Sequence, residues 1–236
     1  MKSRPVLMTG TNVLGILALR KTKTRRILKI QPTPNPARLE FWEKGLGGVP
    51  ANSFIPTSNS GKVGIFEPLH LQCPFGVVGD RLWIRETIWQ WGRWVSNGKT
   101  KGGRPKRKFV SCGFNVRYVA NHPNRPADPP HDRKIVHADE LWVKRPAIHM
   151  PRAACRVEVE LTSIAAERLH DIREADCFAE GIVIDPHHLW RPLGSKEPMR
   201  PLTPHQAFQS LWESIHGDDS WDENPWVWVL GFRLVT

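Results

Sequence analysis

The sequence has few cysteines and no long hydrophobic run. Its four cysteines, Cys73, Cys112, Cys155 and Cys177, lie far apart and form no C-x-x-C pair, so neither a zinc ribbon nor a dense disulfide framework is expected. No apolar stretch approaches the roughly 18 to 20 residues that cross a bilayer, and the N-terminal residues lack the apolar segment of a signal peptide. We therefore expect reduced, mostly buried thiols and a cytoplasmic protein that does not associate with membranes.

The sequence also offers no regular set of metal ligands. His187 and His188 are adjacent, but no nearby Cys, Glu or His supplies the spacing that metal sites usually show. We interpret the pair as part of a loop, and we expect neither a metal nor another cofactor.

What the sequence does contain is typical of a globular protein. Its 236 residues are 40% hydrophobic and 24% charged, which is too apolar for wholesale disorder and sufficient for a real core. We find no internal repeat and no clear domain boundary. We therefore expect one domain over residues 1–236, interrupted by loop insertions at about 31–71, 90–150 and 183–202.

Positive charge is concentrated in two segments. The chain has 34 basic and 23 acidic residues, a net charge of +11, yet residues 1–39 contain nine bases and no acid. The stretch between Glu86 and Asp128 contains nine more bases and again no acid. Outside these segments the balance is negative, because 16 bases face 23 acids.

A localised basic surface attracts phosphodiester backbones, so nucleic acid is the first class of partner to consider. Trp89, Trp91 and Trp94 stand at the start of the second basic segment and suggest stacking platforms for a single-stranded ligand. The alternative is that the cations are solvated loop residues. Most of the eleven tryptophans should belong to the core.

Three helices are predicted from caps and periodicity. The first spans residues 11–20, with Thr11 or Asn12 as its cap. The second spans 172–180, where Asp171 and Glu174 suggest a capping box. The third spans 203–217, where Thr203 precedes a proline in the first turn and a glycine follows the last one.

Strands are predicted where apolar and polar residues alternate, at 79–87 and 155–164, and in the apolar C-terminal run of residues 225–235. A further possible strand covers 114–120 within the second insertion. On the strand at 79–87, alternation places Glu86 on the inward face and Trp83 and Arg85 on the outward face. A buried Glu86 needs a partner, and we expect a structural ion pair with Arg25 or Arg26.

Several stretches of the sequence stand out as motifs. They are RKTKTRR at 20–26, GDRLWIRET at 79–87, DIREADCFAEGI at 171–182, and the WESIHG and PWVWVLGFRL segments that follow. Together they resemble the ASCH family, a branch of the PUA-like β-barrels. In length and layout the chain is similar to the enlarged members found in bacteriophages and prophages. The resemblance implies an α+β fold with a small β-barrel, flanking helices and long inserted loops.

The resemblance also implies a ligand class and a set of site residues. Members of this superfamily bind RNA or modified bases in a cleft beside the barrel, and a small bacterial relative removes the acetyl group from acetylcytidine. By motif, its catalytic positions match Lys21, Thr24 and Glu180. Together with the basic segments, this predicts nucleic-acid contacts from Arg20, Lys23, Arg25, Arg26, Trp83, Arg85, Arg104, Lys106, Arg107 and Lys108.

Amide hydrolysis by this set would need an activated nucleophile. The Thr24 hydroxyl attacks only if a base removes its proton, and Lys21 can serve as that base only if burial or nearby cations lower its pKa. Glu180 would receive and return the proton. Structural roles are equally open, because Lys21 can contact phosphate, Thr24 can satisfy the helix end, and Glu180 can pair with Arg26.

Three functions therefore remain open from the sequence. The first is a module that binds RNA, single-stranded nucleic acid or a modified nucleoside in a basic cleft. The second is an amidohydrolase acting on a modified cytidine-like base. The third is a phage protein, located in the host cytoplasm, whose basic surface binds a host or virion protein.

Overall fold

The structure is a computed structural model that describes residues 1–33, 35–45, 48–58, 70–130, 137–184, 190–192 and 203–235. It is α+β, with mostly strands and few helices, as the sequence predicts. The chain divides into two compact units. The first comprises Met1–Arg4, Leu14–Trp83 and Val157–Thr236, and the second comprises Pro5–Val13 and Ile84–Arg156.

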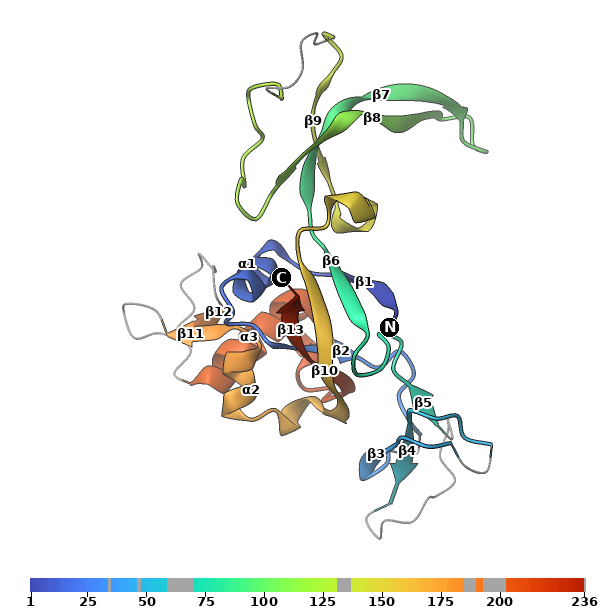
Figure 1. The fold of residues 1–236 in the computed structure, drawn as a ribbon, viewed down its shortest axis with the longest axis vertical. Helices are drawn as coiled ribbons and strands as arrows, with labels where there is room; N and C mark the ends of the chain where they lie inside the picture. Colours follow the sequence, from blue (N-terminus) through green and yellow to red (C-terminus); the bar gives the residue numbers. More distant parts are fainter. Residues whose placement is uncertain are drawn as a thin grey trace. The chain divides into compact units, whose positions relative to one another are not determined.

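A five-stranded sheet with the order β1-β6-β10-β13-β2 contains the strands that were predicted most clearly (Figure 1). The predicted strands at 79–87, 155–164 and 225–235 are confirmed. In the part of the chain that the structure describes, the sheet is open, with β1 and β2 at its edges, and does not close into a barrel. The strands are β1 (Ser3–Leu7), β2 (Lys23–Ile27), β6 (Arg81–Arg85), β10 (Glu158–Arg168) and β13 (Trp226–Val235).

The insertion expected as a loop at 31–71 contains a second sheet. Strands β3 (Arg38–Trp42), β4 (Ser53–Thr57) and β5 (Leu71–Gln72) pair in that order. The Phe54 ring on β4 packs edge-on against Trp228 of β13, with ring centroids 5.0 Å apart. The prediction of a loop was wrong because the flanking Pro, Gly and Ser residues obscured two short apolar strands that are stabilised by this packing.

The predicted caps are right for one helix and wrong for two. Helix α3 (Pro204–His216) begins with a capping box between Thr203 and Gln206. Helix α1 (Gly10–Leu17) is capped two or three residues earlier than expected, because the Thr9 hydroxyl accepts a hydrogen bond from the Asn12 amide. Helix α2 (Glu174–Ala179) has Arg173 at its N-cap position, and the Arg173 side chain makes no capping hydrogen bond. The expected cap, Asp171, lies in a separate 3-10 turn.

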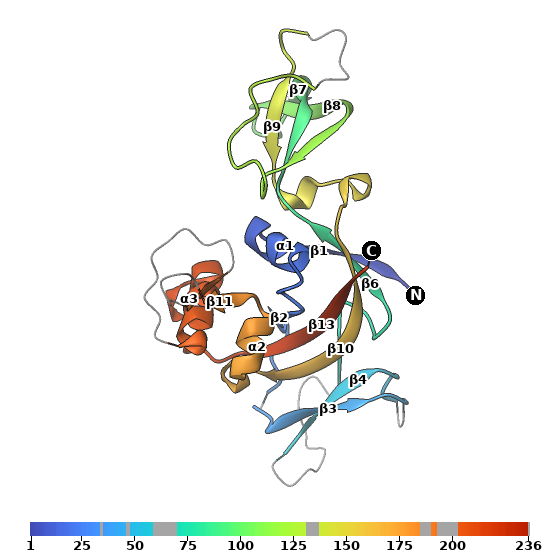
Figure 2. The same ribbon diagram turned by 60° about the vertical axis from the view of Figure 1, so that its left-hand side comes forward.

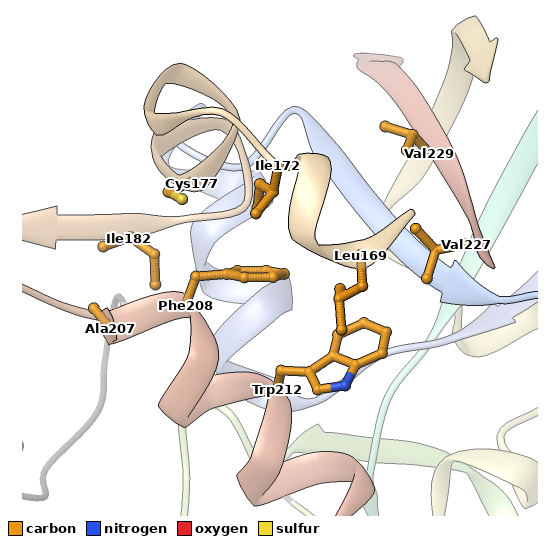
Figure 3. Close-up of a cluster of buried hydrophobic side chains, with 9 residues drawn as sticks. All are labelled: Leu169, Ile172, Cys177, Ile182, Ala207, Phe208, Trp212, Val227 and Val229. Carbon is orange, nitrogen blue, oxygen red and sulfur yellow. The ribbon is translucent and has the colours of Figure 1, made fainter. Parts of the chain in front are cut away.

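Helices α2 and α3 lie side by side next to β2 and β13 (Figure 1 and Figure 2). Figure 3 shows the apolar core that holds them there, with Phe208 and Trp212 of α3 facing Leu169 and Val227. Cys177 of α2 belongs to the same core and is fully buried. The core therefore presents the polar residues of α2 to β2.

In the second unit, strands β7 (Ile88–Lys99), β8 (Pro105–Tyr118) and β9 (Leu141–Arg145) form a sheet with β7 in the centre (Figure 2). Much of the loop insertion expected at about 90–150 is therefore a long hairpin with a third strand. Its Gly, Pro and Lys content is typical of a loop. The strands become apparent only from the backbone pairing of β7 with β8 and β9.

The hairpin corrects the interpretation of two tryptophans as stacking platforms. Trp89 and Trp91 are buried and form a core with Trp142. Their indole nitrogens donate to protein acceptors, at 2.9 Å to the His122 carbonyl and 2.9 Å to a Glu140 carboxylate oxygen. Such indoles stabilise the base of the hairpin and present no free face to a ligand.

Part of the third insertion, at 183–202, lies outside the described residues, as do His187 and His188. Its ends form the short pair β11 (Ile182–Ile184) and β12 (Trp190–Pro192). Among the described residues no helix is long and apolar enough to span a membrane. None of the four cysteines forms a disulfide; Cys177 is buried and the other three are half-buried.

Leu19, between α1 and β2, has a left-handed backbone with φ of 56° and is 70% exposed. Since this conformation strains a residue with a Cβ, Leu19→Gly should raise the free energy of unfolding by up to about 1 kcal/mol. Leu17→Gly, inside α1, should instead lower it by about 1 kcal/mol. Urea denaturation followed by tryptophan fluorescence measures both, and a destabilised Leu19→Gly variant would contradict the expectation.

Candidate functional site

Lys21 and Glu180, which the motif resemblance pairs, are in direct contact. The Lys21 ammonium donates to Glu180 Oε2 at 2.6 Å and to the Glu180 backbone carbonyl at 2.7 Å. Both side chains are buried, with 2% and 4% exposure. Glu180 ends α2, and the chain turns back at Gly181, whose φ of 97° favours glycine.

Arg25 extends this pair into a network. Its guanidinium donates to Glu180 at 3.3 Å, to Glu167 at 2.5 Å and to Asp176 at 3.3 Å. Lys23 donates to the other oxygen of Asp176 at 2.6 Å. Three cations therefore meet three carboxylates, because alternation along β2 directs Lys23 and Arg25 to the face that α2 covers.

Burial determines the protonation chemistry of the network. It lowers the pKa of Lys21, and although the Glu180 carboxylate opposes that change, the nearby charges of Arg26 and Arg25 add to it. Burial alone would raise the pKa of Asp176, but the hydrogen bond from Lys23 and the charge of Arg25 outweigh it and lower that pKa. Lys21 is thus closer to its neutral form than an exposed lysine is.

Thr24 lies on the opposite face of β2 from Arg25, because the side chains of a strand alternate. It is buried, opposite Leu230 in the β13 register. Its hydroxyl makes no hydrogen bond with any residue that the structure describes. The structure therefore brings Lys21 and Glu180 together but gives neither of them a hydrogen bond to Thr24.

An open cavity of about 760 Å³ lies at the outer edge of the network. A second cavity, of about 280 Å³, lies between the β3-β4-β5 sheet and its neighbours. Neither of these two cavities is lined by Lys21, Thr24 or Glu180. Within the described ranges, no group of three His, Cys, Asp or Glu residues could hold a metal. The larger cavity is lined by Lys23, Glu167, Asp171, Arg173, Ala175 and Asp176.

Glu167 and Asp176 complete the network, and neither was predicted as a site residue from the sequence. Asp176 could have been predicted, because it stands four residues before Glu180 and therefore on the same face of α2. Glu167, at the end of β10, offered no comparable local signal.

Glu86 forms the buried ion pair that was expected, but with a different partner. Arg156 binds both of its carboxylate oxygens, at 2.7 and 2.9 Å, and stacks over the Tyr118 ring. The predicted partners Arg25 and Arg26 belong to the other unit, and Arg25 is already bound to carboxylates there. The prediction failed because Arg156 is 70 residues away in sequence.

The remaining residues of the first basic segment differ in exposure. Arg20 is exposed and Arg26 is half-buried. Trp83 and Arg85 lie half-buried on the outward face of β6, as predicted, and Arg85 donates to the Ile148 carbonyl. Their contacts with nucleic acid stay predictions.

Most cations of the second basic segment are exposed on the hairpin of β7 and β8, which is called the basic hairpin from here on. Arg93 pairs with Asp139 at 3.5 Å, and Arg117 lies over the Trp142 ring. The cations around the turn make no ion pair with any described residue and are exposed, namely Lys99, Lys101, Arg104, Lys106, Arg107 and Lys108.

Removing Glu180 would leave two buried cations with fewer partners. Glu180→Ala should lower the free energy of unfolding by about 3–5 kcal/mol. The matched control is Glu160→Ala, which breaks the exposed pair with Arg233 and should cost less than about 1 kcal/mol. Equal losses in chemical denaturation would show that the buried network does not carry the stability assigned to it.

Comparison of the chain with protein-family models, with curated proteins and with solved structures found no match in any of the three. Function must therefore be inferred from the two groups of charged residues themselves, the buried network around Glu180 and the basic hairpin.

Proposed function

We propose that this chain is a nucleic-acid-binding protein and that the basic hairpin is its main contact surface. The observation that carries the proposal is the exposed row of cations on this hairpin, Lys99 to Lys108, in a stretch of chain without any acid between Glu86 and Asp128. Cations held at a surface with no carboxylate beside them are free to replace the counterions of a phosphodiester backbone.

The first basic segment, residues 1–39, contributes less to the proposed binding of nucleic acid. Lys21 and Arg25 are buried, and together with Lys23 they face three carboxylates. Their charge is largely offset inside the protein, so a phosphate near β2 would meet mainly Arg20, which is exposed. We therefore assign the salt-dependent part of binding to the hairpin.

We also propose that the chain is related to the ASCH branch of the PUA-like proteins. One observation supports this relationship. The lysine and the glutamate at the motif positions, Lys21 and Glu180, are hydrogen-bonded although 159 residues separate them.

The proposal predicts a specific change in salt dependence. Replacing Arg104, Lys106, Arg107 and Lys108 with Ala should reduce the slope of log K against log salt by up to about 3 for a single-stranded ligand. The measurement is fluorescence anisotropy with labelled oligonucleotides over a series of salt concentrations.

The matched control removes the same charge elsewhere. Lys2, Lys29, Lys44 and Arg173 are exposed and lie outside the hairpin. Their replacement with Ala should change the slope by less than about 1, since they make few phosphate contacts under the proposal. An unchanged slope in the hairpin variant would remove the hairpin from the interface.

The second candidate function is an amidohydrolase that acts on an acylated nucleoside, and the lowered pKa of Lys21 favours it. In this reaction neutral Lys21 takes the Thr24 proton as the Thr24 oxygen bonds to the acyl carbon. The C–N bond then breaks, the amine leaves with a proton relayed through Glu180, and water hydrolyses the acyl ester. All three side chains are buried, and Thr24 makes no hydrogen bond to Lys21 or Glu180. The site must therefore open for substrate and bring the Thr24 hydroxyl within reach of Lys21.

Incubation with acylated cytidine and other acylated nucleosides, followed by mass spectrometry, tests this function. Since the base is neutral lysine, kcat/KM should rise with pH through the lowered pKa of Lys21. Lys21→Ala and Thr24→Ala should each abolish turnover, whereas Lys29→Ala, at an exposed site, should not. Turnover that survives Lys21→Ala and Thr24→Ala would refute the mechanism.

A further inference from the structure

We propose that the ligand of the basic hairpin is single-stranded and that an unpaired base stacks on Trp94, on one defined face of the hairpin. This inference rests on the proposed nucleic-acid function and adds the form of the nucleic acid and the contact that selects it. The face is formed by Trp94, Phe109, Arg107 and Arg145, here called the aromatic face.

Trp94 differs from the other tryptophans of this sheet. It is 43% exposed, whereas Trp89, Trp91 and Trp142 are all buried. The buried indoles each donate a hydrogen bond to a protein acceptor, but the Trp94 indole donates none to any residue that the structure describes. An exposed indole with an unused donor is a common base-stacking element in proteins that bind single strands.

Local packing holds this indole in place. Trp94 stands directly opposite Phe109 in the ladder, and their rings meet edge to face with centroids 5.5 Å apart. Phe109 reaches over Gly92, where a Cβ would lie 2.6 Å from the ring. Because Gly92 has no side chain, the phenyl ring fills that space and supports Trp94 from one side.

Arg145 adds a cation to the same face. Its guanidinium carbon lies 4.7 Å from the Phe109 centroid and 5.8 Å from that of Trp94. It forms no ion pair with any acid in the described ranges. A guanidinium beside an exposed indole can bind the phosphate that follows a stacked base, or stack on the next base itself.

The strand register separates two kinds of contact. Arg107 stands opposite Ser96, two residues beyond Trp94, so it shares the aromatic face. Lys108 stands opposite Val95 and therefore lies on the other face, as Lys106 does by alternation. The aromatic face can thus hold bases while lysines on the other face contact only the backbone.

This arrangement favours a single strand over a duplex. Paired bases are already stacked on each other, and a two-stranded ribbon that reads a duplex places polar side chains against base edges in the major groove. Here the centre of the face is an aromatic pair whose single donor, the Trp94 indole N–H, is too little to read base edges. Unpaired bases, in contrast, expose the ring faces that an indole binds.

The test compares three ligands of equal length: oligothymidylate, an abasic oligomer with the same phosphates, and a duplex. Trp94→Ala should weaken binding to oligothymidylate by about 5-fold to 100-fold, the range expected for loss of one stacked base. It should weaken binding to the abasic oligomer by less than about 2-fold, because only phosphates remain. Trp94→Phe should restore most of the affinity.

Phe114→Ala is the matched control, since Phe114 is a 58% exposed aromatic residue of β8 outside the aromatic face. It should leave all three affinities unchanged. An equal loss on oligothymidylate and the abasic oligomer, or wild-type affinity for the duplex as high as for the single strand, would overturn the inference while leaving the proposed function intact. If the wild-type protein binds none of the three ligands, the proposed function itself fails.

Discussion

The burial of Lys21 and Arg25 places the strongest constraint on the first unit. A cation without a partner in a protein interior costs several kcal/mol, so both side chains require carboxylates at defined positions. Glu180 satisfies both at once, and Asp176 and Glu167 complete the shell around Arg25. The end of α2 at its C-cap Glu180, the contact of α2 with β2 and the end of β10 at Arg168 together place these carboxylates around Arg25. The apolar core of Phe208 and Trp212 stabilises the same arrangement.

Lysine and arginine side chains are paired with carboxylates in the first unit and largely unpaired at the surface of the second. In the first, Lys21, Lys23 and Arg25 are neutralised by carboxylates. In the second, the bases around the hairpin turn, Lys99 to Lys108, are exposed and form no ion pair with any described acid. The net charge of the two segments in the sequence is similar, but only cations without a neighbouring carboxylate attract a polyanion over distance. The proposed function therefore follows from where the carboxylates are, as much as from where the bases are.

The candidate chemistry of Lys21 follows from the same network. Burial that lowers its pKa is what a general base at neutral pH requires, yet the hydrogen bonds to Glu180 hold the amine in place and the surrounding side chains cover it. A buried, hydrogen-bonded Lys21 can stabilise the fold as it stands. It can act in catalysis only if the surrounding residues open to admit a substrate. The hairpin needs no such opening, and this favours nucleic-acid binding over hydrolysis.

Local patterns in the sequence determined the strands β6, β10 and β13 and the helix α3, because alternation, apolar runs and capping residues act over a few neighbours. They also determined the segregation of charge. The pairing of Lys21 with Glu180 was implied only by the family resemblance, since 159 residues separate the two. Only the tertiary structure decided that the partner of Glu86 is Arg156, that Glu167 and Asp176 surround Arg25, and that Trp94 is exposed while Trp89 and Trp91 are buried. These contacts join residues dozens to more than 150 positions apart, where packing between elements, and not local periodicity, selects the partner.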